Sequence, residues 1–172
     1  MANAIAKPEI HERFLDALGD SVVNQPDIDE FPMEIHLEPP LPPKVRVCAY
    51  PVTTPPGSNQ NANHIVRIIL PDQGPGERNS FDHSGGYLVL LVGYAEDPNV
   101  FILWDAGLHQ NVLYGKQVHV KPGPVFEAVG GGIGTQERHL KTGTETVLTA
   151  NANNLGAAIE KRSQLTTERL TG

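Results

Sequence analysis

The sequence predicts an α+β fold, built around a mainly antiparallel curled sheet or a partly open β-barrel with short flanking helices. Most apolar runs are short and are separated by Gly, Pro, Asn or Asp, which is typical of strands joined by turns. Helical periodicity is confined to segments near the two ends and one short segment between them, so helices and strands do not alternate as in a doubly wound parallel sheet. A chain of 172 residues is long enough for one domain with a hydrophobic core.

The N-terminal part differs in composition from the rest. Apolar residues recur at helical spacing over Pro8–Leu18, and Gly19 is expected to end that helix. Residues 24–43 are acidic and proline-rich, which favours an extended, polyproline-like arm. We therefore divide the chain into an N-terminal helix with an acidic, Pro-rich arm, residues 1–43, and an α+β domain, residues 44–172.

Short apolar or alternating runs predict the elements of the second part. The expected strands are Val45–Tyr50, His64–Leu70, Tyr87–Tyr94, Val100–Trp104, Gln117–Lys121 and Thr144–Ala150. The expected helices are Pro124–Val129, which Gly130 ends, and the amphipathic segment Leu155–Leu165. The two most apolar strands are separated by five residues and should form an antiparallel hairpin at the centre of the sheet.

Charge is distributed unevenly along the chain. The net charge of −7 alone would argue against nucleic acid as a partner. Residues 1–43 carry two basic and nine acidic residues, however, so the remainder of the chain is balanced. Between residues 115 and 141, four basic residues face two acidic ones, and this segment is locally positive. A surface that binds nucleic acid is therefore compatible with the charge of residues 44–172, and the segment 115–141 is its expected place.

Several other classes of protein are disfavoured by the composition. Cys48 is the only cysteine, which excludes a disulfide framework and multi-cysteine zinc or iron–sulfur sites, and it fits a reducing compartment. No apolar run approaches the roughly 20 residues needed to cross a bilayer, and the first residues contain no signal-peptide core. We expect a cytoplasmic protein with no membrane partner and no bound cofactor.

Polar residues gather after the apolar strand Val100–Trp104. Asp105 ends that strand, His109 follows, and Gln117, His119 and Lys121 should share the outer face of a later strand, because side chains alternate along strands. Such side chains can contact base edges and phosphates, and a tryptophan can stack on an exposed base. The expected DNA-binding residues are Trp104, Asp105, His109, Lys116, Gln117, His119, Lys121, Arg138 and Lys141.

A purely structural role is the alternative for these residues. In that case Trp104 fills the core, Asp105 caps the turn at Gly107, and the outward side chains of the later strand face water.

A second alternative uses the same region for catalysis. A strand followed by an acid, then a strand ending in lysine, is the layout of Mg²⁺-dependent PD-(D/E)xK nucleases, in which two acids hold the metal. Here His119 stands where the second acid should be, and imidazole is a poor ligand for Mg²⁺. A working site would need Asp82 or Glu127 beside Asp105 and Lys121.

The run Tyr87–Leu165 resembles the non-catalytic recognition domains of bacterial restriction endonucleases and their methyltransferase neighbours. The resemblance is carried by Phe101–Ala106, Gln117–Lys121, the helix Val125–Val129 and Glu145–Leu148, together with the closing helix. It implies a module that reads sequence or a modified base in duplex DNA, with the nuclease domain outside these residues.

We therefore expect a DNA-binding specificity module of a restriction-type system in bacterial defence. Its partners would be double-stranded DNA and either a second copy of itself or a separate nuclease domain. The Mg²⁺-dependent nuclease is one alternative. The other is a protein-interaction domain whose acidic, proline-rich arm binds a partner.

Overall fold

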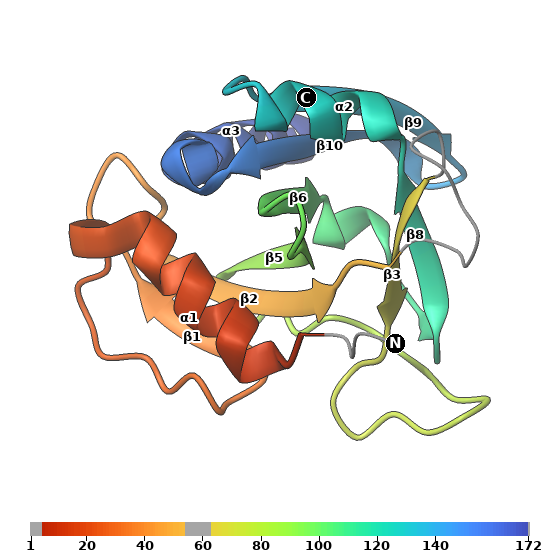
Figure 1. Cartoon of the computed structure of the whole chain (residues 1–172). Helices are drawn as coiled ribbons and strands as arrows, with labels where there is room; N and C mark the ends of the chain where they lie inside the picture. Colours follow the sequence, from red (N-terminus) through yellow and green to blue (C-terminus); the bar gives the residue numbers. More distant parts are fainter. Residues whose placement is uncertain (1–4, 54–62, 172) are drawn as a thin grey trace.

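A computed structural model describes residues 5–53 and 63–171 of the chain (Figure 1). Its helices are α1 (Lys7–Leu18), α2 (Pro122–Val129) and α3 (Leu155–Thr171). Its strands are β1 (Met33–His36), β2 (Lys44–Pro51), β3 (His64–Ile68), β4 (Arg78–Asn79), β5 (Leu88–Ala95), β6 (Val100–Trp104), β7 (Val112–Leu113), β8 (Lys116–Val120), β9 (Gly134–Leu140) and β10 (Gly143–Asn151). None of these helices combines the length and apolarity that crossing a membrane requires.

Six strands form the main sheet, in the order β1-β2-β5-β6-β10-β9. All neighbours in it are antiparallel except β2 and β5, which run parallel. The expected hairpin of β5 and β6 lies near the centre, but its connection has four residues because Ala95 still belongs to β5. The sheet is curled and does not close into a barrel, so the predicted α+β class is confirmed.

Two further strand pairs lie outside the main sheet. Strands β3 and β8 form an antiparallel ribbon, and the short strands β4 and β7 form another pair. A parallel pair such as β2 and β5 requires a long crossover connection, and here that connection includes β3 and β4.

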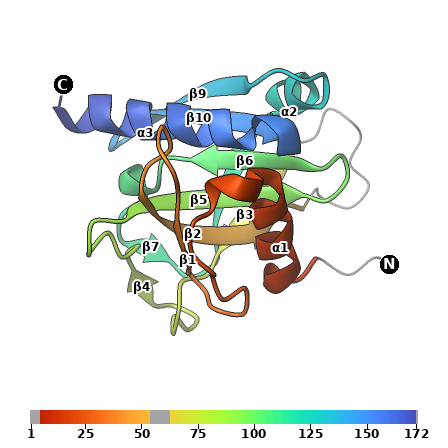
Figure 2. The ribbon, with the colours of Figure 1, turned by 90° about the vertical axis from the view of Figure 1, so that its left-hand side faces the viewer.

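Each face of the main sheet has its own hydrophobic core. Helices α1 and α3 cover one face, which is turned toward the viewer in Figure 2. The β3–β8 ribbon and α2 cover the other face (Figure 1). Strand β2 shows why both faces are covered, because Val45 and Val47 pack toward the helices whereas Cys48 and Tyr50 pack toward the ribbon.

The N-terminal segment contributes to the same core. The predicted helix is present as α1, and Ile10 and Phe14 are fully buried beneath it. The proline-rich arm, expected to be extended and polyproline-like, contains strand β1, which pairs with β2. Met33 and Ile35 alternate inward along it, and their burial favours the strand. The domain boundary at residue 43 stays a prediction.

Candidate nucleic-acid interface

The outer face of the β3–β8 ribbon is polar. Cα partners place Arg67 opposite Gln117 and Ile65 opposite His119, while Val66 and Val118 face each other on the buried side. Arg67 and Gln117 are exposed. The predicted alternation of β8 is therefore confirmed, with its valines buried and its polar side chains outward.

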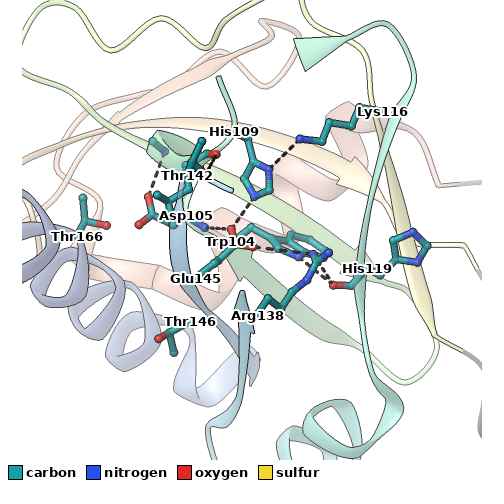
Figure 3. Close-up of polar contacts among 12 residues, drawn as sticks. Trp104, Asp105, His109, Lys116, His119, Arg138, Thr142, Glu145, Thr146 and Thr166 are labelled. Atoms are coloured by element: carbon teal, nitrogen blue, oxygen red, sulfur yellow. Dashed lines mark hydrogen bonds and ion pairs between the residues drawn. The ribbon is translucent and has the colours of Figure 1, made fainter. Parts of the chain in front are cut away.

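Basic side chains surround this outer face. Lys116 begins β8, and Lys121 follows its last residue at the start of α2. From β9, Arg138 donates through Nη1 to the main-chain carbonyl of His119 at 3.2 Å (Figure 3). The amide oxygen of Gln136 accepts from the main-chain N–H of Lys121 at 2.8 Å. These contacts fix β9 against β8 and bring the positive charges of two strands together.

His119 has a particular electrostatic environment on this face. Burial lowers its pKa below the usual value of 6.5, and the positive charge of Arg138 lowers it further. The imidazole is therefore neutral near pH 7, with one nitrogen that donates and one that accepts. A neutral imidazole suits the polar edge of a base better than a phosphate.

A buried carboxylate lies beneath the basic residues. The Glu145 side chain, 0% exposed, accepts through Oε2 from Nε2 of His109 at 2.6 Å and from the main-chain N–H of Asp105 at 2.9 Å (Figure 3). Nδ1 of His109 lies 3.5 Å from the Lys116 ammonium. Oε1 of Glu145 lies 3.9 Å from Nη1 of Arg138. The carboxylate thus provides the negative charge that holds Lys116, through His109, and Arg138 at the edge of the ribbon.

Asp105 belongs to a different cluster. Its carboxylate accepts from Arg169 and from the main-chain N–H of Gly107, and it forms an ion pair with Arg162. Burial lowers the pKa of Arg162, while the charges of Asp105 and Glu145 oppose that shift. Asp105 and Arg169 also line a pocket of about 360 Å³ beside α3. The Asp105 side chain therefore fastens α3 to the end of β6.

The structure brings together five of the nine predicted residues along β8 and β9. These are Lys116, Gln117, His119, Lys121 and Arg138. Lys141 is exposed in the turn after β9.

The other three predicted residues are buried and support the face instead of forming its surface. Trp104 is 0% exposed, and its indole N–H donates to the carbonyl of His119 at 3.2 Å. Asp105 is 3% and His109 2% exposed. The structural alternative described from the sequence, with Trp104 in the core and Asp105 capping the turn at Gly107, is confirmed.

Sequence reasoning missed two members of this site. Arg67 is the exposed residue between buried Val66 and Ile68, so the alternation of β3 was a signal that pointed to it. Glu145 is a carboxylate at an inward position of β10, which its spacing from Val147 indicates. That spacing alone does not name its partners.

The acids considered for Mg²⁺ do not form a metal site in the described part of the chain. No group of three or more His, Cys, Asp or Glu residues there is placed to hold a metal ion. Arginines occupy both oxygens of Asp105, and Oδ1 of Asp82 accepts from Ser84. The carboxylate that lies beside Asp105 is that of Glu145, which accepts from the main-chain N–H of Asp105 and from His109.

The fold and this site define an α+β protein in which a two-stranded ribbon, packed on a curled sheet, presents a basic and amide-bearing face. The chain belongs to the Methylase-associated X1 family, whose model matches residues 43–159. The matched range includes the ribbon, β9 and Glu145, and the family's description associates its members with methylases. No curated protein and no solved structure shows significant similarity to the chain.

Proposed function

We propose that this chain is a DNA-binding module of a methylase-linked, restriction-type system, and that it contacts duplex DNA through the ribbon face. By ribbon face we mean the outer side of β3–β8, which carries Arg67, Gln117 and His119, together with the basic residues at its edges, Lys116, Lys121 and Arg138. The observation that carries the proposal is the composition of this face. Within the described residues, the outer side of the ribbon carries an arginine, a glutamine and a histidine but no carboxylate.

The shape of the ribbon supports the same proposal. The major groove of B-DNA admits a two-stranded β-ribbon, whose outward side chains then reach base edges. Arginine can bind guanine, and glutamine can bind adenine, each through two hydrogen bonds. Arg67 and Gln117 lie on directly opposed positions of the ribbon, where such contacts would fall on neighbouring base pairs.

The distribution of charge also supports it. The exposed acids of α1, among them Glu9, Glu12 and Asp16, lie on the opposite face of the sheet from the ribbon. The carboxylate of Glu145, close beneath the ribbon face, is buried against His109. Part of the negative charge behind the net charge of −7, that of the α1 acids, therefore lies away from the proposed DNA surface.

Anisotropy titrations of a labelled duplex at several salt concentrations test the proposal. Arg67→Gln, Lys116→Gln and Arg138→Gln should each weaken binding and lower the slope of log K against log salt by about 1 for each phosphate that the protein no longer neutralises. Lys161→Gln on α3 removes one positive charge from the helix-covered side of the sheet and is the matched control. An unchanged affinity and slope in a variant that combines all three ribbon substitutions would overturn the proposal.

The same titration tests what the module reads. Duplexes that differ only in 5-methylcytosine or N6-methyladenine should be bound with different affinities if the ribbon reads a modified base. Gln117→Ala should reduce sequence or modification preference more than it reduces total affinity, because a base-edge contact specifies whereas a phosphate contact only positions. Cleavage of the duplex on addition of Mg²⁺ would favour the nuclease alternative over a module that only binds DNA. No binding at low salt would favour the protein-interaction alternative.

A further inference from the structure

A pocket of about 490 Å³ lies between the β1–β2 edge of the main sheet and the segment 70–82. Its apolar wall includes Phe31, Leu70 and Phe81, and buried Cys48 lies at its inner side. The volume is in the range of sites that bind small organic molecules. The pocket is separate from the ribbon face, because none of the residues that define that face lines it.

Arg46 gives this pocket a fixed shape. Its guanidinium is buried and donates through Nε and Nη2 to the same oxygen of Glu34, Oε2, at 2.9 and 2.7 Å. Nη1 donates to the main-chain carbonyls of Asp82 at 2.6 Å and Ser84 at 3.1 Å. One side chain therefore ties strand β1 to the far wall, and its donors are largely committed to the protein. A ligand phosphate would find no unused guanidinium fork here.

Glu34 is the polar group that a ligand can use. Both hydrogen bonds from Arg46 go to Oε2, and Oε1 accepts no hydrogen bond within the described residues. The Glu34 side chain is 42% exposed and lines the pocket. The pocket thus combines aromatic and aliphatic walls with one fixed, accessible carboxylate acceptor. Asn79 and Ser80 add neutral polar groups at its rim.

We propose that this pocket binds a nucleobase that carries an exocyclic amino group, such as cytosine or adenine. The flat ring packs against Phe31 and Phe81, and the amino group donates to Oε1 of Glu34. A carboxylate selects such bases because it accepts from the amino hydrogens of cytosine or adenine but not from the carbonyl that uracil or hypoxanthine presents at the same position.

The base can come from DNA or from a free nucleoside. The position of the pocket favours DNA, because Leu70 and Pro71 in its wall closely follow β3 of the ribbon. Enzymes and readers that act on single bases rotate the nucleotide out of the duplex into a pocket of this kind. This source rests on the proposed DNA-binding function, whereas binding of a free nucleoside does not.

Two sets of titrations test the inference. In the first, calorimetry compares cytidine with uridine and adenosine with inosine. The wild-type protein should prefer the amino-bearing member of each pair by about tenfold or more. Glu34→Gln keeps an acceptor for Arg46 but presents an amide donor to the ligand, so it should abolish or reverse the preference. Glu38→Gln, which removes an exposed carboxylate from the same arm outside the pocket, should leave the preference unchanged.

In the second set, duplexes carry cytosine or uracil opposite an abasic site, where the base leaves the stack at low cost. The wild type should bind the cytosine duplex about tenfold more tightly, and Glu34→Gln should lose that difference while keeping its affinity for fully paired DNA. Arg67→Gln should lower the affinity for fully paired DNA and keep the preference for cytosine over uracil. Phe81→Leu should weaken the binding of all four nucleosides. Because it leaves the Glu34–Arg46 ion pair in place, it tests the pocket even if Glu34→Gln fails to fold.

The outcomes separate the two proposals. Selective nucleoside binding without DNA binding would support the nucleobase pocket, with a free nucleoside as its ligand. It would overturn the proposal that the chain is a DNA-binding module. DNA binding that depends on the ribbon but never distinguishes cytosine from uracil, together with no preference among free nucleosides, would overturn the pocket and keep the module. A preference that persists in a folded Glu34→Gln variant would also overturn the pocket as described.

Discussion

Arg169, near the end of α3, binds both carboxylate oxygens of Asp105. Its Nε lies 2.7 Å from Oδ2 and its Nη2 lies 3.1 Å from Oδ1. Arg162, further back on the same helix, approaches Oδ2 to 3.5 Å and is itself buried. One carboxylate at the end of β6 thus pairs with two guanidinium groups and fixes the C-terminal helix against that strand.

This arrangement predicts unequal effects of removing its members. Asp105→Asn should lower the free energy of unfolding by about 3 kcal/mol, because it leaves the buried Arg162 without its main counter-charge. Arg169→Gln should cost about 1 kcal/mol, because its side chain is 27% exposed and water screens the pair. Urea unfolding followed by circular dichroism measures both values. Equal losses for the two variants would show that Arg162 does not depend on Asp105.

The close approach of the ribbon to the main sheet depends on Gly93 in β5. A Cβ atom there would lie 2.8 Å from Cγ2 of Val66 in β3 and 2.9 Å from the Trp104 ring. Gly93→Ala should therefore destabilise the protein by about 1 to 3 kcal/mol, since the surrounding core must move to accept one methyl group. Because Val66 lies on the buried side of the ribbon, the variant should also weaken DNA binding.

Thermal unfolding and the anisotropy titration together check this prediction. Gly123→Ala at the start of α2 is a suitable control, because an added Cβ there meets no atom within 4 Å. A Gly93→Ala protein with wild-type stability would mean that the ribbon does not pack as closely on β5 as the structure indicates.

Local sequence patterns predicted the elements whose side chains divide clearly between core and water. Strands β2, β3, β5, β6, β8 and β10 and all three helices were found in this way. Strand β9 was missed, because Gly134–Leu140 contains one large aliphatic residue and is held by its pairing with β10. The parallel pairing of β2 with β5 was missed as well, because it joins segments that are distant in the sequence.

The candidate site shows the same limit. Alternation along β8 placed Gln117 and His119 outward, and the structure agrees. The burial of Asp105 could not be predicted, because its partner Arg169 lies 64 residues later and no local pattern relates the two. Burial of Trp104 was open for a similar reason, since it depends on packing by the ribbon, which crosses the sheet face from another part of the chain.

Stability should fall as the pH is lowered, in part through His11. The His11 side chain is fully buried in the folded protein and reaches water only on unfolding. Burial lowers its pKa in the folded protein below the usual 6.5, although a hydrogen bond from Nδ1 to the carbonyl of Ile28 at 2.7 Å opposes the shift, and the charge of Lys7 adds to the lowering. The unfolded chain therefore binds a proton more readily than the folded protein. The contribution is complete above about pH 6.5 and is lost as the pH falls toward the folded-state pKa.

Unfolding free energies between pH 5 and pH 8 measure this effect. For one such histidine the slope approaches about 1.4 kcal/mol per pH unit, and burial lowers the pKa of His64 and His119 in the same direction. His11→Asn, whose amide can still donate to Ile28, should reduce the slope. A slope identical to that of the wild type would exclude His11 as a contributor.

The thiol of Cys48 should be unreactive in the native protein. Burial raises its pKa to about 12, and the nearby charges of Arg46 and Lys7 offset only part of that increase. At pH 8 about one thiol in ten thousand is then ionised, and the thiolate is the species that reacts with iodoacetamide or an aromatic disulfide reagent. Labelling should therefore be slow in buffer and rapid in urea, where the thiol regains its ordinary pKa.

The labelling rate also reports on the pocket that Cys48 lines. Reaction of a buried thiol requires local opening, so slow labelling in buffer gives the free energy of that opening when reclosure is fast. Arg46→Met removes the side chain that ties β1 to segment 82–84 and should accelerate labelling while the far helices stay folded. Cytidine at saturating concentration should slow it in the wild type. Rapid stoichiometric labelling of the wild-type protein in buffer would show that reagents reach the Cys48 thiol through the pocket without local opening.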